Sequence, residues 1–308
     1  MTVMHSMYRE SGQVAVDEQT CVRCGSCVKI CPADVLTMDG ERVRVSPASL
    51  FGCIACGHCM MVCPEGAIAV TGRGLSPQDL MALPKPEERA SGEALAALMQ
   101  ARRSVRRFRD QPVDPHLVER VVELAATAPM GIPPWDIGCV SVIGREEVQR
   151  IAHQVVKGYE GFLTLFKPWV LKVMRPFTGQ AKYDLFANFV RPLAQSYVGA
   201  HREGRDKLFY EAPALLIFHH SPYADALDAS IACTYAMLAA ESLGLGSTII
   251  GGAPPILQRN KVLCHQLGIP DENKPSIVLI LGFPAVSFRK TIRRRFTHIS
   301  TIDANRKP

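Results

Sequence analysis

The cysteines are the residues of this chain with the clearest chemistry, because eight of the eleven lie between Cys21 and Cys63. These eight form the pattern C-x2-C-x2-C-x3-C-P twice in succession. Three closely spaced thiolates on a tight turn can each bind one iron of a cubane cluster, whereas the fourth is turned away by a helical step. The spacing therefore predicts two 4Fe-4S clusters with the ligands Cys21, Cys24, Cys27, Cys31, Cys53, Cys56, Cys59 and Cys63.

The fourth cysteine of each run is expected to complete the cluster of the other run, as in two-cluster bacterial ferredoxins. One cluster would then use Cys21, Cys24, Cys27 and Cys63, and the second would use Cys53, Cys56, Cys59 and Cys31. The two halves, CVRCGSCVKICPADVL and CIACGHCMMVCPEGAI, repeat each other at a 32-residue offset. Zinc also accepts four thiolates, but structural zinc sites use paired C-x2-4-C knuckles.

The other thiols and the one histidine inside the motifs have simpler interpretations. His58 lies within the second motif, yet cysteines already fill all cluster positions, so we expect a packing or surface residue. Cys139, Cys233 and Cys264 have apolar neighbours and are expected to be small core residues.

The composition is that of a globular protein with a large core. The chain has 308 residues, of which 47% are hydrophobic and 21% charged, and this excludes disordered and collagen-like classes. No apolar run reaches the roughly 18 residues that a membrane-spanning helix needs. The first twenty residues lack the layout of a secretory signal, so we expect a cytoplasmic protein.

Two domains and a linker are expected. Residues 1–75 would be the iron-sulfur domain, residues 76–92 a linker rich in Pro, Gly and charge, and residues 93–308 a second domain. In the second domain, helices are expected at Glu93–Gln100, after an Asp114 cap with Pro115, and at Asp225–Leu243. The expected strands are Ile137–Ile143, Leu215–His219 and Ile277–Leu281.

The stretch from Tyr159 to Tyr210 is rich in aromatic residues and allows three interpretations. The first is a helical cap with its aromatics in the core, the second a lid over a planar ligand, and the third a membrane-surface segment. The long apolar helix Asp225–Leu243 must lie in the middle of a domain or at a subunit interface.

Positive charge is concentrated outside the cysteine segment. Residues 1–75 carry a formal charge of −1 and the remainder +7, which together give +6. The runs ARRSVRRF and FRKTIRRRF offer guanidinium forks that suit phosphate, although such runs also occur as solvated faces or nucleic-acid patches. No nucleic-acid fold motif accompanies them, so nucleic acid is not the expected partner.

Three segments in order resemble the nitroreductase family of FMN oxidoreductases: R-R-S-x-R-x-F after an opening helix, GLGSTIIGG after a long apolar helix, and LGFP before a basic stretch. The resemblance covers residues 93 to about 298. It implies an α+β fold, with a four- or five-stranded antiparallel sheet flanked by helices. It also implies an intertwined homodimer that binds FMN at two interfacial sites.

The resemblance also implies which residues contact FMN. The first segment would contact the phosphate, the ribityl chain and the pyrimidine edge, late arginines would close on the phosphate, and a backbone amide after the long helix would face N5. A turn supplied by the partner subunit would complete the site, and here it reads PMGIPPW, without the family's Asn and Gln. The matching residues are Arg102, Arg103, Ser104, Arg106, Pro129, Met130, Gly131, Ile250, Gly251, Gly252, Arg293 and Arg295.

These features predict an oxidoreductase in which no side chain is required as a catalytic acid or base. A flavin converts single electrons into two-electron chemistry, so the leading hypothesis passes electrons between the clusters and FMN to an electron-poor acceptor such as a nitroaromatic, quinone or enone. A ferredoxin-type or other redox partner would supply the electrons. In the alternatives, NAD(P)H is the donor and the clusters export electrons, or the chain is a redox relay or sensor without substrate turnover.

Overall fold

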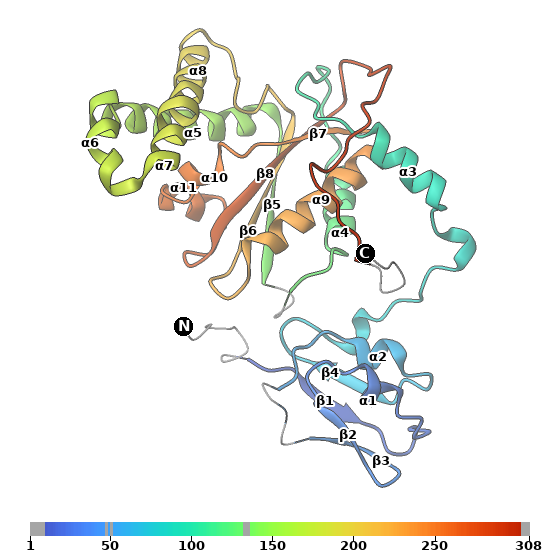
Figure 1. The fold of residues 1–308 in the computed structure, drawn as a ribbon. Helices are drawn as coiled ribbons and strands as arrows, with labels where there is room; N and C mark the ends of the chain where they lie inside the picture. Colours follow the sequence, from blue (N-terminus) through green and yellow to red (C-terminus); the bar gives the residue numbers. More distant parts are fainter. Residues whose placement is uncertain (1–9, 47–48, 50–51, 132–135, 303–308) are drawn as a thin grey trace.

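The structure is a computed structural model that describes residues 10–46, 49, 52–131 and 136–302. A small amino-terminal unit holds the cysteine motifs, and an extended segment joins it to a larger α+β unit (Figure 1). In the part of the chain that is described, no helix is long and apolar enough to cross a bilayer.

The amino-terminal unit contains two copies of one motif, in which a glycine precedes a short helix that ends at a cysteine. Helix α1 (Ser26–Ile30) and helix α2 (His58–Val62) each follow a glycine in the left-handed conformation, Gly25 with φ 69° and Gly57 with φ 73°. Each helix ends at the fourth cysteine of its motif. The 32-residue repeat of the sequence is therefore also a repeat of backbone conformation, because left-handed φ values favour glycine at these two positions.

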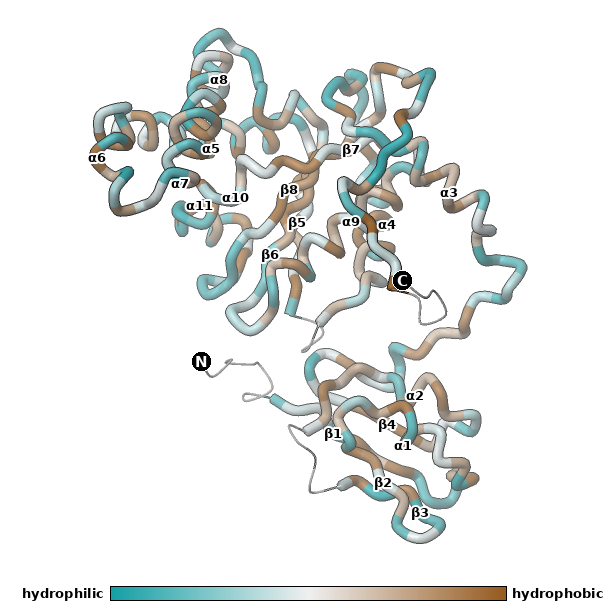
Figure 2. The backbone as a smooth tube through the Cα atoms, in the orientation of Figure 1, coloured by the Kyte–Doolittle hydropathy of each residue, from teal (hydrophilic) through white to brown (hydrophobic). Residues whose placement is uncertain are grey.

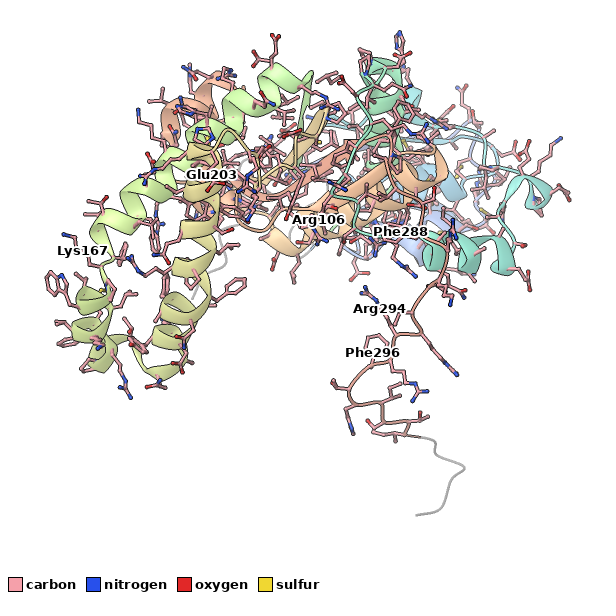
Figure 3. The ribbon with its side chains drawn as sticks, turned by 90° about the horizontal axis from the view of Figure 1, so that it is seen from above. Arg106, Lys167, Glu203, Phe288, Arg294 and Phe296 are labelled. Carbon is pink, nitrogen blue, oxygen red and sulfur yellow. The ribbon has the colours of Figure 1, made fainter. Side chains whose placement is uncertain are left out.

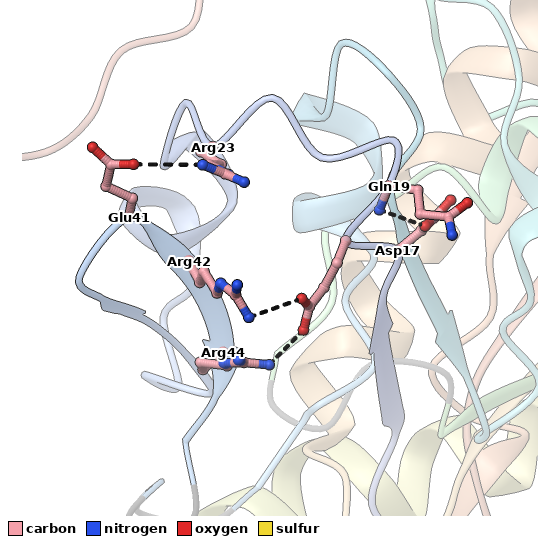
Figure 4. Close-up of polar contacts among 7 residues, drawn as sticks. Asp17, Gln19, Arg23, Glu41, Arg42 and Arg44 are labelled. Atoms are coloured by element: carbon pink, nitrogen blue, oxygen red, sulfur yellow. Dashed lines mark hydrogen bonds and ion pairs between the residues drawn. The ribbon is translucent and has the colours of Figure 1, made fainter.

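Two short two-stranded sheets accompany the cysteine segments. Strand β1 (Gln13–Val16) pairs antiparallel with β4 (Ile68–Thr71), and β2 (Leu36–Asp39) pairs antiparallel with β3 (Arg42–Val45). The core between them is small and includes two of the cysteines themselves, Cys27 and Cys59. On the surface, Glu18 accepts from both Arg42 and Arg44, which ties β3 to the segment after β1 (Figure 4).

The connecting segment contains two short 3-10 turns, η2 (Pro77–Asp79) and η3 (Pro86–Glu88). Each begins with proline and closes with a capping box, in which the carboxylate of Asp79 or Glu88 accepts from the backbone amide of the N-cap residue. No residue of either turn is buried. The segment is thus stiffened locally without packing on a core.

The second unit is built on an antiparallel sheet in the order β5-β6-β8-β7. The strands are β5 (Ile137–Ile143), β6 (Ala214–His220), β7 (Gly246–Ile249) and β8 (Lys274–Gly282). The three strands predicted from the sequence are confirmed, and β7 was not predicted. Alternate residues of β6 face different cores, with Leu215 and Ile217 on one side and Leu216 and Phe218 on the other.

Helices cover both faces of this sheet (Figure 1). Helix α4 (Pro115–Ala125) and helix α9 (Ala226–Ser242) pack on one face. Helix α5 (Arg145–Leu165), α8 (Arg191–Arg202), α10 (Pro254–Leu257) and α11 (Lys261–Gln266) pack on the other. The hydropathy colouring in Figure 2 shows the apolar strands in the middle of these layers. The predicted α+β architecture is therefore correct.

The predicted helix ends are also found. Asp114 accepts a hydrogen bond from the His116 amide at 2.9 Å, with Pro115 in the first turn of α4. Asp225 caps α9 in the same way, and Gly244 follows the helix with φ 77°. Helix α3 (Gly92–Ala101) matches the predicted Glu93–Gln100 and is capped by Ser91.

The aromatic segment divides between the core and the surface. It forms the end of α5, then α6 (Pro168–Thr178), α7 (Gln180–Leu185), the π-helical turn Phe186–Val190 and α8. Tyr159 and Phe162 are buried, whereas Trp169, Phe177 and Phe189 are 65%, 89% and 60% exposed. The core interpretation therefore holds for the aromatics of α5 and for Phe186, which packs against the same core, and is wrong for Trp169, Phe177 and Phe189.

Candidate functional site

The first set of thiols lies around the start of α1 and the end of α2. Cys27 is buried, and the charges of Cys63 and Cys21 would act on it, which further raises the pKa of its thiol beyond the effect of burial. Cys24 is exposed and lies within 3.4 Å of the Ser26 hydroxyl. The fourth cysteine of the second motif is thus on the side of the first motif, as the exchange of ligands requires.

The second set lines one small apolar cavity that includes Cys31, Cys53, Cys56 and Cys59. Burial raises the pKa of the Cys59 thiol to about 12, and the charges of Cys53, Cys56 and Cys31 add to the rise. A bound cation would stabilise the thiolate there, because burial disfavours an unpaired negative charge. The chemistry of this donor set therefore fits an iron-sulfur cluster.

Hydrogen bonds to the sulfurs follow the duplication. The amide of Val35 donates to Cys31 Sγ at 3.3 Å, and the amide of Ala67, 32 positions later, donates to Cys63 Sγ at 3.2 Å. Among the described residues, no three His, Cys, Asp or Glu side chains converge as the ligands of a single ion do.

His58 has a contact that the sequence analysis did not predict. Its side chain is exposed, as expected, but Nδ1 lies 3.2 Å from Cys56 Sγ. The equivalent position of the first motif is Ser26, which contacts Cys24. The duplicated positions therefore present different polar groups to the two cysteine sets.

An arginine cluster joins the loop after α3 to the carboxyl-terminal segment. Burial lowers the pKa of Arg102, and the charges of Arg294 and Arg103 lower it further, whereas Glu241 opposes the shift. Arg103 also donates to the hydroxyl of Thr291. A polyanion such as phosphate would relieve this repulsion, because guanidinium groups bind it with paired hydrogen bonds. The residues present thus fit the phosphate of FMN.

The late arginine that acts on Arg102 is Arg294, which lies between the two predicted residues. Arg293 and Arg295 are exposed on the same extended segment. Figure 3 shows Arg294 and Phe296 on this segment where it leaves the body of the protein. A cavity of about 550 Å³ lies beside the cluster, lined in part by Arg103, Glu241, Arg289 and Lys290.

Strand β7 holds the predicted phosphate loop in place. The amide of Val105 donates to the carbonyl of Ser247 at 3.0 Å, and the hydroxyl of Thr248 donates to the carbonyl of Val105 at 2.6 Å. The Val105 side chain is buried against Gly246. Because neighbours along an extended chain point to opposite sides, Ser104 and Arg106 are exposed.

The turn after β7 brings glycine amides and two tyrosines together. Ile250 donates its amide to the Val278 carbonyl at 2.8 Å, which anchors the start of the Gly251–Gly252 turn to β8. Tyr159 donates to the Gly252 carbonyl at 2.6 Å. A Cβ on Gly252 would lie 3.1 Å from the Tyr197 hydroxyl, so this tyrosine also packs against the turn. Burial raises the pKa of Tyr197 to about 12. Neither tyrosine was predicted from the sequence as part of this site.

Arg106 approaches this turn through a third tyrosine. Its guanidinium lies 5.9 Å from the ring centroid of Tyr210, whose charge would act on Tyr197. The structure therefore brings the predicted residues Arg102–Arg106 and the Gly251–Gly252 turn to one region.

The predicted turn Pro129, Met130 and Gly131 lies elsewhere in the same chain. A methyl group on Gly131 would lie 3.1 Å from Asp228 Oδ2, in the first turn of α9. Arg102, in contrast, is coupled to Glu241 in the last turn of α9. Trp135, the end of the PMGIPPW match, lies outside the described residues.

The turn instead faces the iron-sulfur unit. A cavity of about 550 Å³ is lined on one side by residues 126–131 and on the other by Pro32, Ile54, Cys56 and His58. Arg73 Nη2 also lies 3.4 Å from Asp136 Oδ2, and the Arg73 side chain is only 5% exposed. This ion pair joins the two units.

Comparisons with known proteins agree with this division. The nitroreductase family matches residues 99–283, and a 4Fe-4S dicluster domain matches residues 9–68. No curated protein matches the chain significantly.

Solved structures resemble the second unit. A Bacteroides fragilis nitroreductase with bound FMN is 18% identical, with a TM-score of 0.52, and the match covers 68% of this chain and 98% of that one. A Desulfitobacterium hafniense nitroreductase with bound FMN is 20% identical, with a TM-score of 0.48, and the match covers 67% and 98%.

Proposed function

Because this chain belongs to the nitroreductase family and carries a 4Fe-4S dicluster domain, we propose that it is an FMN-dependent oxidoreductase fed through iron-sulfur clusters. Two 4Fe-4S clusters accept single electrons from a ferredoxin-type donor, and an electron-poor organic molecule is the final acceptor. Nitroaromatics, quinones and enones are the acceptor class. The active form is a homodimer.

The two cysteine sets hold the clusters. The coupling of Cys27 with Cys21 and Cys63, and of Cys59 with Cys53, Cys56 and Cys31, supports the exchange of the fourth ligand. Buried thiols and backbone amides aimed at sulfur are the surroundings that stabilise a cluster and set its potential.

The second unit holds FMN. Arg102, Arg103 and Arg294 supply the positive charge for the phosphate, and the Gly251–Gly252 turn supplies backbone donors. When bound, FMN supplies the exchange between single-electron and two-electron chemistry. The chain's own residues need only bind, orient and exclude water, so no side chain is assigned as an acid or base.

The stoichiometry follows from the donor class. Two molecules of a one-electron donor are oxidised for each acceptor molecule that takes up two electrons, and the acceptor takes two protons from water. The observation that carries the proposal is the Arg73–Asp136 contact, which brings the thiolate unit against the family domain within one chain.

An anaerobic titration of the reconstituted protein tests this function. Flavin and cluster absorbance are followed together, first with NAD(P)H and then with a reduced ferredoxin. We expect bleaching of the flavin with ferredoxin and none with NAD(P)H. Rapid bleaching by NAD(P)H would instead indicate that NAD(P)H reduces the flavin and that the clusters export the electrons.

A cysteine variant makes the titration specific. Cys24→Ala removes a ligand of the first cluster and should abolish ferredoxin-driven turnover, whereas Cys264→Ala removes a thiol of the second unit and should not. Intact turnover in Cys24→Ala would contradict the proposal. Absence of turnover with every acceptor of the class would favour the alternative in which the chain is a redox relay or sensor without substrate turnover.

A further inference from the structure

The two parts of the predicted FMN site lie at opposite ends of α9 in one chain. A Cβ on Gly131 would lie 3.1 Å from Asp228 Oδ2 in the first turn of the helix, whereas the charge of Glu241 in the last turn acts on Arg102. At 1.5 Å per residue, these two acidic residues are about 20 Å apart along the helix axis. The turn at 126–131 therefore does not reach the Arg102–Arg106 loop of its own chain.

The face of α9 between these two ends is apolar and exposed. Leu227, Ile231 and Tyr235 follow one another at intervals of four residues and are 67%, 38% and 39% exposed. Residues four apart share one face of a helix, so the three side chains form a stripe. Buried residues of α9, such as Ala232 and Ala236, occupy the opposite face.

A second copy of this chain is the occupant that this stripe fits. A twofold axis across the middle of α9 pairs two such helices in antiparallel orientation, because each copy must present the same surface to the other. The first turn of one α9 then lies beside the last turn of the other. This arrangement places the 126–131 turn of one copy beside the Arg102–Arg106 loop of the second copy, which completes both parts of the site.

The iron-sulfur unit and the turn line one cavity, and the unit lines it with residues of one cluster set. Of the eight motif cysteines, the cavity against residues 126–131 is lined only by Cys56, a member of the second set, together with its neighbours Pro32, Ile54 and His58. The Arg73–Asp136 pair also joins this unit to the second unit. The cluster of Cys31, Cys53, Cys56 and Cys59 is therefore the one that faces the flavin-binding turn.

We propose that this second cluster passes electrons to the FMN held by the arginine loop of the other subunit, so that each iron-sulfur unit serves its partner's flavin. The inference rests on the proposed function, and it names the route within it. One electron at a time leaves the cluster, and two such transfers, with protons from water, complete one two-electron reduction of the flavin.

Mixed dimers test whether the site is shared. One subunit carries Arg102→Ala with Arg103→Ala, and the other carries Gly131→Leu, whose side chain collides with Asp228. Each homodimer should lack FMN, whereas the mixed dimer keeps one intact site and should bind one FMN by absorbance and native mass. A mixed dimer without FMN would overturn the shared site.

The route is tested by adding Cys56→Ala to one subunit of the same mixed dimer. On the subunit with the intact turn, the change should lengthen the FMN fluorescence lifetime, because a quenching cluster is lost, and abolish bleaching by reduced ferredoxin. On the other subunit, neither value should change. The opposite dependence would show delivery within one chain and overturn the proposal.

Two further variants keep the result interpretable. Cys24→Ala, the same motif position in the first half, should leave the FMN lifetime unchanged on either subunit. Asp136→Asn keeps every cluster ligand and loosens docking, so it should slow bleaching only on the subunit with the intact turn. FMN binding without bleaching by any donor would contradict the proposed function, whereas the FMN count tests the shared site by itself.

Discussion

Gly246 is the position where one methyl group should damage the flavin site without touching it. In Gly246→Ala, the new Cβ would lie 2.6 Å from Cγ2 and 2.7 Å from Cβ of Val105. Val105 is 3% exposed, and its β-branched side chain has little rotamer freedom to move away. The loop that carries Ser104 and Arg106 must therefore shift off β7.

The expected cost follows from overpacking. Inserting a methyl group into a filled core typically costs about 1–3 kcal/mol. A shifted loop should also weaken FMN binding about tenfold or more, which corresponds to ~1.4 kcal/mol. Iron content should not change, because the cysteine motifs lie in the other unit.

A double variant tests whether the clash with Val105 causes these losses of stability and FMN affinity. Val105→Ala removes two methyl groups and should cost about 1.6 kcal/mol from transfer alone, with a cavity term in addition. In the double variant, the smaller side chain makes room for the methyl group, so the two costs should not add. We expect a favourable coupling of about 1–3 kcal/mol.

The assays are urea midpoints and the FMN Kd from fluorescence quenching, measured for the single and double variants. Gly199→Ala is the matched control, since a Cβ there meets nothing within 4 Å. It should leave the Kd unchanged and slightly stabilise α8. Additive costs, or an unchanged Kd in Gly246→Ala, would refute the role assigned to this contact.

Three other changes have defined outcomes. His58→Ala should lower the midpoint potential of the second cluster by about 20–60 mV, equal to the usual 0.5–1.5 kcal/mol of a hydrogen bond, and EPR titration measures it. Tyr197→Phe should flatten the loss of stability between pH 10 and 12, because the raised pKa of Tyr197 makes the folded state hold its proton longer. Asp114→Ala should cost about 1 kcal/mol in unfolding experiments and leave FMN content unchanged.

The sequence predicted what local spacing determines. Helix ends at Asp114 and Asp225 depend on caps within a few residues, and strand β5 depends on its own alternation, so both were found. The left-handed glycines and the repeated amide–sulfur contacts likewise follow from the duplication.

Contacts between distant segments were not predicted. Arg294 rather than Arg293 or Arg295 acts on Arg102, because the path of an extended segment depends on what it packs against. Tyr159 and Tyr197 meet Gly252 only through the packing of α5 and α8. Trp169 and Phe177 are exposed although their composition suggests a core, since hydrophobicity alone does not say whether a face has a partner in the same chain.

The stiffened segment between the two units also sets how strongly they must attract each other. A short tether holds its two ends at an effective concentration in the millimolar range, so a contact with a dissociation constant of about 1 mM is already formed for much of the time. The Arg73–Asp136 pair can therefore be weak and still keep the iron-sulfur unit beside the turn at 126–131. In the proposed route, the same weakness would let the unit open and meet an external electron donor between two transfers.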